Sequence, residues 1–226
     1  MKIVIFEPHP DDLLFGVGPI IFDWVEEGHE IHVITITDGR ACYRATKDRL
    51  DEQAKNMTED ELAEMRINEA KKAINFIGLP RKNHHLLKFH DADGQKYVNE
   101  AIEEVNPILK GTDRIVLPSD NNSHVDHQAT HDIAIKAAQD LKLKDSEYLV
   151  YFVPSYGKWN DDSKEKQIVV HITENLREKL LNWLQIYQSQ KYMKFTWRMF
   201  NHFIKVLENF TFGIFAYSDM GKYHNF

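Results

Sequence analysis

Residues 3–12 read Ile3-Val4-Ile5-Phe6-Glu7-Pro8-His9-Pro10-Asp11-Asp12, an apolar run followed at once by an imidazole and two carboxylates. A short run of apolar, largely β-branched residues that ends at a proline is typical of a buried strand in a parallel sheet. In open α/β sheets, ligands bind at the carboxyl ends of the strands. The side chains of His9, Asp11 and Asp12 therefore stand where such a fold would have its functional site.

A second polar cluster follows another apolar run in the same way. The run Ile115-Val116-Leu117 precedes the segment His124-Val125-Asp126-His127. The carboxyl ends of parallel strands share one edge of a sheet, so we expect the two loops to meet around one metal ion. A catalytic zinc ion typically has three protein ligands and one position left for water. The candidates for these ligands are His9, Asp12 and His127.

Other side chains of the two clusters have the chemistry that hydrolysis at a metal requires. Asp11 is adjacent to Asp12, so it can face the cavity and take a proton from a water molecule. His124 precedes His127 by three residues and can present a donor to the same cavity. Asp126 can hold an imidazole in orientation through a hydrogen bond.

Each cluster alone also has a simpler explanation. The His-Pro-Asp-Asp sequence of residues 9–12 is typical of a turn before a helix, because proline fixes φ and aspartate caps helices. Asp126 is likewise a candidate helix N-cap. Two such clusters, each after a predicted strand, favour a metal site over two unrelated turns. We expect the other histidines at the surface, without a metal role: His29, His32, His84, His85, His90, His131, His171, His202 and His224.

The hydrophobic pattern predicts alternating strands and helices, which indicates an α/β fold with parallel crossovers. A chain of 226 residues suits one such domain. Residues 40–58 are charged and poorly periodic, so we expect a loop there. Strands are predicted at 3–7, 31–36, 84–89, 114–118, 148–153, 168–172 and 210–217, and helices at 14–27, 58–77, 99–109, 126–141, 176–188 and 194–208.

Composition narrows the class of protein. With 28 Lys+Arg and 35 Asp+Glu, the formal net charge is −7, which argues against a nucleic-acid binder. Cys42 is the only cysteine, so an intramolecular disulfide and a zinc site with several thiolates are excluded. The N-terminal apolar run is too short for a signal peptide, and no run of about 18 apolar residues predicts a transmembrane helix. We expect a cytoplasmic protein.

In its motifs the chain resembles the zinc-dependent de-N-acetylase family, which includes LmbE-like proteins and the N-acetylglucosaminyl-phosphatidylinositol (PIG-L type) deacetylases. The resemblance covers about residues 1–190. The family's (A/P)HPDDE and HPDH motifs, its RxxE helix and its Ser-Gln pair correspond in order to Pro8-His9-Pro10-Asp11-Asp12-Leu13, His124-Val125-Asp126-His127, Arg66-Ile67-Asn68-Glu69 and Tyr187-Gln188-Ser189-Gln190.

The resemblance implies a Rossmann-like, mostly parallel sheet with helices on both faces, and hydrolysis of the acetamide of an N-acetylglucosamine-type sugar. It implies Zn²⁺ as the cofactor, although a site of this kind also accepts Fe²⁺ or Co²⁺. The implied roles are metal ligand for His9, Asp12 and His127, general base for Asp11, general acid for a protonated His124 with Asp126 as its partner, and substrate contact for Arg66. An ion pair on the helix surface near Glu69 is the alternative for Arg66.

Two departures from the family pattern leave alternatives open. Leu13 replaces a glutamate, which we expect to change the surroundings of the site or the substrate rim, and Val125 replaces a proline. A metal-containing sugar-binding protein without turnover is the alternative function. A nucleotide-binding Rossmann protein is disfavoured, because Ile21 breaks the G-x-G-x-x-G spacing. We expect the aromatic residues 191–226 to pack on the single domain as an extension, with a homo-oligomer contact as the alternative.

Overall fold

A single seven-stranded sheet organises the described part of the chain. The computed structural model describes residues 1–120, 122–153 and 167–220. The strand order is β3-β2-β1-β4-β5-β7-β6, in which the first five are parallel and β7 runs antiparallel to both of its neighbours. The expected mostly parallel α/β fold is confirmed. The strands are β1 Lys2–Glu7, β2 Glu30–Thr37, β3 His84–Phe89, β4 Arg114–Pro118, β5 Glu147–Tyr151, β6 Gln167–His171 and β7 Asn209–Phe215.

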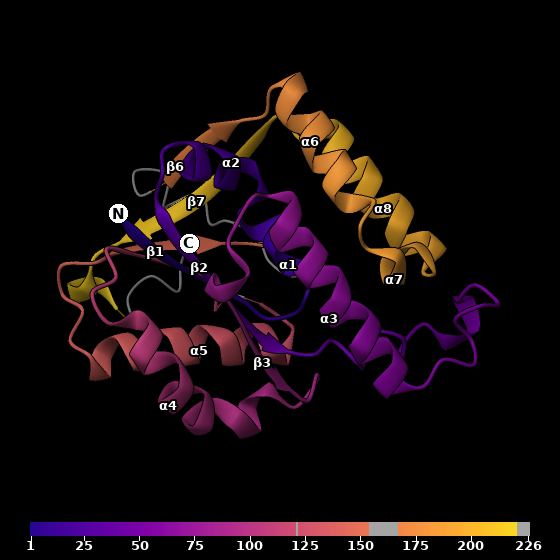
Figure 1. The fold of residues 1–226 in the computed structure, drawn as a ribbon, viewed down its shortest axis with the longest axis horizontal. Coiled ribbons are helices and arrows are strands. Elements are labelled where there is room, and N and C mark those ends of the chain that lie inside the picture. Colours follow the sequence, from indigo (N-terminus) through magenta and orange to yellow (C-terminus); the bar gives the residue numbers. More distant parts are fainter. Residues whose placement is uncertain (121, 154–166, 221–226) are drawn as a thin grey trace.

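Helices cover both faces of the sheet (Figure 1). Side chains alternate between the two faces along a strand, so Ile3 and Ile5 of β1 face one core while Val4 and Phe6 face the other. α4 (Val98–Leu109) and α5 (Val125–Asp140) close the second core. The first is closed by α1 (Asp12–Gly16), α2 (Gly18–Glu26), α3 (Glu59–Phe76), α6 (Glu174–Leu184) and α8 (Lys194–Val206); the short α7 is Gln188–Lys191.

Two helix starts show how local sequence shapes the fold. Thr58 and Glu61 form the expected capping box at the start of α3, with side chain and backbone bonded reciprocally. The helix expected over residues 14–27 is instead interrupted at Val17, whose φ of −135° is not helical. Pro19 lies in the first turn of α2, where its missing N–H costs nothing. The break lets α1 begin at Asp12, directly within the polar cluster.

The aromatic C-terminal region contributes an interior strand. β7 lies between β5 and β6, and its Phe212 is fully buried. On α8, Phe200 packs against Phe15 with ring centroids 4.3 Å apart. Tyr223 and Phe226 lie outside the described residues. Within the described ranges, none of the helices combines the length and hydrophobicity needed to cross a membrane.

The expectation that His84 is exposed at a strand edge is wrong. β3 is the edge strand of the sheet, yet the His84 side chain is only 4% exposed. Its Nε2 lies 2.9 Å from Thr35 Oγ1, and that hydroxyl donates to Glu7 Oε1 at 2.5 Å. His131 is likewise buried, with Nδ1 2.9 Å from the Pro118 carbonyl oxygen. Both side chains point into the packed interior, where each imidazole has a hydrogen-bond partner.

The burial of His84 predicts a loss of stability in acid. Burial, reinforced by His85 and Lys71, lowers the pKa of His84 from 6.5 to about 4. The unfolded chain therefore binds this proton first as the pH falls, and stability present above pH 6.5 is lost towards pH 4. We expect this loss to be on the order of 3 kcal/mol. In His84→Gln, unfolding free energies measured by urea denaturation from pH 7 to pH 4 should show a flatter profile.

The matched control is His202→Gln, on the exposed surface of α8. It should retain the wild-type pH profile, because replacing an exposed side chain removes few contacts of the folded protein. Parallel profiles for wild type and His84→Gln would contradict the prediction.

Candidate active site

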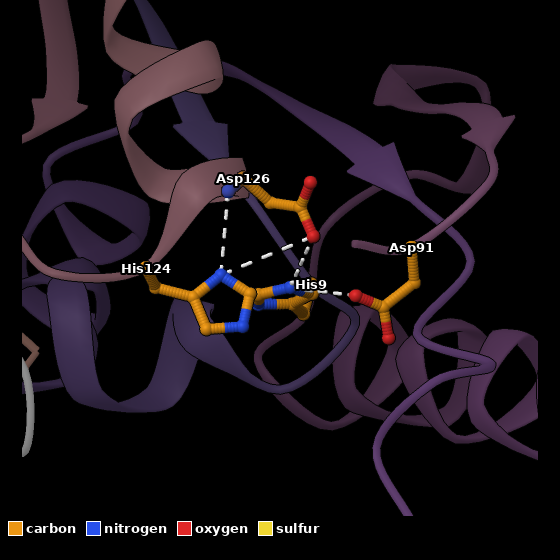
Figure 2. Close-up of side chains that lie close together, drawn as sticks. All are labelled: His9, Asp91, His124 and Asp126. Carbon is orange, nitrogen blue, oxygen red and sulfur yellow. Dashed lines mark hydrogen bonds and ion pairs between the residues drawn. The ribbon is translucent and has the colours of Figure 1, made fainter. Parts of the chain in front are cut away.

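The two polar clusters predicted from the sequence meet at the carboxyl edge of the sheet. β1 and β4 are hydrogen-bonded neighbours, so the loops that follow them lie side by side. Figure 2 shows His9 from the first loop beside His124 and Asp126 from the second. The rings of His9 and His124 are in edge-to-face contact at 4.7 Å. The expected meeting of the two loops is confirmed.

His9, Asp12 and His127 present three ligand atoms to one another. Asp12 Oδ2 lies 2.9 Å from His9 Nδ1 and 3.3 Å from His127 Nε2, and all three residues are buried. The other nitrogen of each ring also has a polar partner. His9 Nε2 lies 3.3 Å from Asp126 Oδ2, and His127 Nδ1 lies 3.1 Å from Asn122 Nδ2. Two imidazoles and a carboxylate, each with a fixed orientation, are a donor set that fits a divalent transition metal.

A second group of possible ligands, His9, Asp91, His124 and Asp126, overlaps the first. Its carboxylates already have other partners. Asp126 accepts the backbone N–H groups of Ala92 and Gly94, both at 2.7 Å, and Asp91 Oδ2 accepts that of Ala41 at 2.9 Å. Both oxygens of Asp126 are used in this way, whereas Asp12 accepts one backbone N–H, from His9 at 3.0 Å, and this contrast favours His9, Asp12 and His127 as the candidate metal site.

Opposite charges compensate within the cluster. Burial alone would lower the pKa of His9, but the neighbouring carboxylates, above all Asp91, hold it well above its ordinary value. Burial would likewise raise the pKa of Asp12, but His127 and His9 hold it well below the usual range. The proton therefore resides on His9 rather than on Asp12, and a divalent cation would replace that positive charge.

Asp11 pairs with Arg66. An Arg66 Nη2–H donates to Asp11 Oδ1, and Nη1–H donates to the Gly39 carbonyl oxygen at 3.2 Å. Burial raises the pKa of Asp11 despite the opposing effect of the guanidinium. Arg66 is only 3% exposed, so the alternative of an ion pair on the helix surface is wrong. The two neighbouring aspartates thus face different partners.

His124 and Asp126 are arranged differently from the expectation. The Asp126 carboxylate lies closer to His9 Nε2, at 3.3 Å, than to His124 Nδ1, at 3.9 Å. His124 is the N-cap of α5, and its Nδ1 accepts the Asp126 N–H at 3.3 Å. Burial, with His9 and His127 nearby, lowers the pKa of His124 to about 4, so the expectation of a protonated His124 near neutral pH is wrong. With Nδ1 as acceptor, the proton of the neutral ring is on Nε2.

Asp91 is a site residue that sequence reasoning missed. Its Oδ1 lies 3.3 Å from His9 Nε2, and burial is outweighed by His9 so that the pKa of Asp91 is lowered. Its position in the sequence could have indicated this role, because Asp91 follows the end of β3 at the same edge of the sheet.

The RxxE and Ser-Gln motifs meet in the structure. Glu69 of α3 accepts the Ser189 N–H at 2.8 Å and the Ser189 hydroxyl at 2.6 Å, across 120 residues of sequence. Gln190 then lines the cavity, and its side-chain N–H donates to Cys42 Sγ at 3.6 Å. The bonds between Glu69 and Ser189 hold α7 against α3, the helix that also carries Arg66.

Of the two effects expected at Leu13, a change in the substrate rim is not seen, because Leu13 is not among the residues that line the cavity. The Leu13 side chain is 3% exposed and packs in the apolar core. Its backbone N–H donates to Glu7 Oε2 at 2.9 Å, so Glu7 supports the start of α1 from behind the polar cluster. Burial raises the pKa of Glu7 to about 8, although the Thr35 hydrogen bond opposes this.

A cavity of about 440 Å³ opens over the cluster. Its lining includes His9, Asp11, Asp12, Arg66 and His124. The volume lies within the range of about 300–1,000 Å³ that is usual for small-molecule sites. A ligand in the cavity would contact two of the candidate metal ligands, His9 and Asp12, together with the candidate base and His124.

Comparisons with known proteins agree with this architecture. Residues 4–138 match the family model described as GlcNAc-PI de-N-acetylase (PIG-L). A diacetylchitobiose deacetylase from Thermococcus kodakarensis is 29% identical over 141 residues, which are 60% of this chain and 48% of that protein. The match therefore spans about half the length of that relative.

Solved structures share the fold at low sequence identity. An N,N'-diacetylchitobiose deacetylase from Pyrococcus horikoshii has a TM-score of 0.72 and 22% identity, covering 97% of this chain and 85% of that one. A teicoplanin deacetylase in a zinc-inhibited form has a TM-score of 0.68 and 13% identity, with 95% and 97% covered.

Proposed function

The chain belongs to the PIG-L family of GlcNAc-PI de-N-acetylases, and on this premise we propose that it is a metal-dependent hydrolase that removes the acetyl group from an N-acetylated amino sugar. The observation that carries the proposal is the cluster of His9, Asp12 and His127, two members of which, His9 and Asp12, line one cavity together with Asp11. Binding alone would need no buried base next to the metal ligands. Hydrolysis of an amide needs both a polarised carbonyl and an activated water molecule.

We propose His9, Asp12 and His127 as the metal ligands and zinc as the metal, with iron or cobalt as alternatives. When bound there, a divalent ion supplies Lewis-acid chemistry, which polarises the acetyl carbonyl and lowers the pKa of water. Zinc inhibits one structural neighbour, so the native ion has to be measured. Asp126 holds the His9 imidazole in the orientation that ligation requires, because a carboxylate accepts from Nε2 and leaves Nδ1 for the metal.

Asp11 is the proposed general base. It takes a proton from water as the oxygen attacks the acetyl carbon, and Arg66 keeps the carboxylate turned into the cavity. His124 donates a hydrogen bond from Nε2 to the oxygen that becomes negative in the transition state. The C–N bond then breaks, and the proton held by Asp11 passes to the leaving nitrogen. The products are acetic acid and a free amine, which together account for all the atoms of water and amide, and at neutral pH the proton of the acid passes to the amine to give acetate and an ammonium group.

Metal analysis followed by product measurement tests the proposal. The purified protein should contain about one equivalent of a divalent metal, and it should release acetate and free amine in equal amounts from N-acetylglucosamine or diacetylchitobiose. Removal of the metal with a chelator should abolish release, and re-addition should restore it. Stoichiometric metal with sugar binding but no acetate from any N-acetylated sugar would favour the alternative, a sugar-binding protein without turnover.

A further inference from the structure

Part of the cavity lining is apolar. Next to the catalytic cluster, Phe15 of α1 and Phe200 of α8 pack with ring centroids 4.3 Å apart. Met193 and Met199 extend this surface along the same helix. Methionine side chains adapt to ligands of different shape, and aromatic rings provide a large apolar area. A sugar ring can stack on one aromatic face, but the apolar lining also includes two methionine side chains, so it offers area for an apolar group attached to the sugar as well.

The apolar part of the lining, formed by Phe15, Met193, Met199 and Phe200 and called the apolar wall below, continues along α8 to the outer surface of the molecule. Met199 lines the cavity and is 37% exposed, and Phe195, four residues earlier on the same side of the helix, is 73% exposed. Contact of a phenylalanine side chain with water is unfavourable. Contiguous exposed apolar side chains are typical of binding surfaces. The wall therefore leads from the catalytic cluster towards the solvent.

The cations of the cavity already have carboxylate partners. Among the described lining residues, Arg44 and Arg66 are the arginines. Arg44 donates from Nε and Nη2 to the two oxygens of Glu59, at 2.6 and 2.8 Å, and Arg66 donates to Asp11. An anionic substrate group would have to compete with these carboxylates, at Arg66 with a buried ion pair and at Arg44 with an exposed pair that costs less to disturb.

From this apolar wall and these paired arginines we infer that the substrate carries an uncharged, apolar group, alkyl or aryl, on its amino sugar, and no phosphate. The group would lie on Phe15, Met193, Met199 and Phe200 and extend towards Phe195. The inference rests on the proposed function for the sugar, but the apolar surface can be tested without turnover.

Calorimetric titration with hexyl β-glucoside, which has no acetamide to hydrolyse, tests the surface directly. The wild type should bind it with a negative heat-capacity change, the signature of apolar burial. Met199→Glu should weaken binding by roughly tenfold or more, and Met199→Leu should retain it. The control Val206→Glu adds the same charge to an exposed apolar position of α8, about 10 Å further along the helix, and should leave the affinity unchanged. Equal affinities for wild type and Met199→Glu would overturn the inference.

Rates of acetate release give the second test. The kcat/KM for hexyl N-acetyl-β-glucosaminide should exceed that for free N-acetylglucosamine by roughly tenfold, and N-acetylglucosamine 1-phosphate should be the poorest of the three. Equal values, or a preference for the phosphate, would overturn the inference. If none of the three is deacetylated, the proposed function fails, while the titration with hexyl β-glucoside still decides whether the apolar surface binds.

Discussion

Replacing His127 with alanine should abolish stoichiometric metal binding and, with it, acetate release. His127 is fully buried, and its Nε2 lies 3.3 Å from Asp12 Oδ2, so no other side chain or solvent takes its place easily. Loss of a partner that merely orients a ligand costs about 10–100-fold in metal affinity. Loss of a ligand should cost more than this. Metal content by mass spectrometry and affinity by competition with a chromogenic chelator measure the effect.

The matched control is His131→Ala, on the same helix α5. His131 is also buried, but its Nδ1 bonds to the Pro118 carbonyl oxygen and it lies outside the cluster. Both variants leave a space in the interior and should lower the melting temperature, whereas only His127→Ala should lose the metal. A His127→Ala protein that still binds one equivalent with wild-type affinity would refute the ligand set.

Asp11→Asn should retain the metal and lose turnover. Asparagine keeps the size of the side chain and can still accept from Arg66, but it cannot take a proton from water. Positioned bases typically contribute about 10²–10⁴-fold to a rate, so kcat should fall by about that factor. Acetate release and metal content, measured on the same preparation, separate the loss of the base from the loss of the ion.

The substitution also weakens a buried ion pair, and that effect needs its own control. Asp38→Asn does the same to another buried aspartate, which accepts from Arg40 Nε at 2.8 Å outside the cavity. Loss of one partner of a buried pair costs up to about 3–5 kcal/mol, so both variants should unfold more easily. Only Asp11→Asn should lose turnover. If Asp11→Asn deacetylates within tenfold of the wild type, Asp11 is not the base.

Local patterns in the chain were sufficient for the strands that position the site. The apolar runs before residues 9 and 124 predicted β1 and β4, and their polar loops pointed to the cluster of His9, Asp12 and His127. Such predictions succeed because burial of a strand imposes a short-range pattern that each segment carries by itself. The roles of these side chains in metal binding and catalysis stay predictions.

Contacts between residues that lie far apart in the chain could not be predicted from the sequence of any single segment. The pairing of Asp11 with Arg66, the bond from Asp126 to His9 and the approach of Asp91 to the same imidazole depend on which loops become neighbours. Burial of His84 had no local signal either, because a polar residue at a strand edge is usually exposed.

The residue types of the candidate site could therefore be predicted from residues 3–12 and 115–127 alone. The kinds of side chain present and the ends of strands are local properties of the sequence. The three-dimensional fold supplied the partners of each group and the apolar wall from α8. It also placed β7 between β5 and β6, a non-local antiparallel pairing that periodicity does not encode. Residue type sets what a side chain can do, and the order of the strands sets which group it meets.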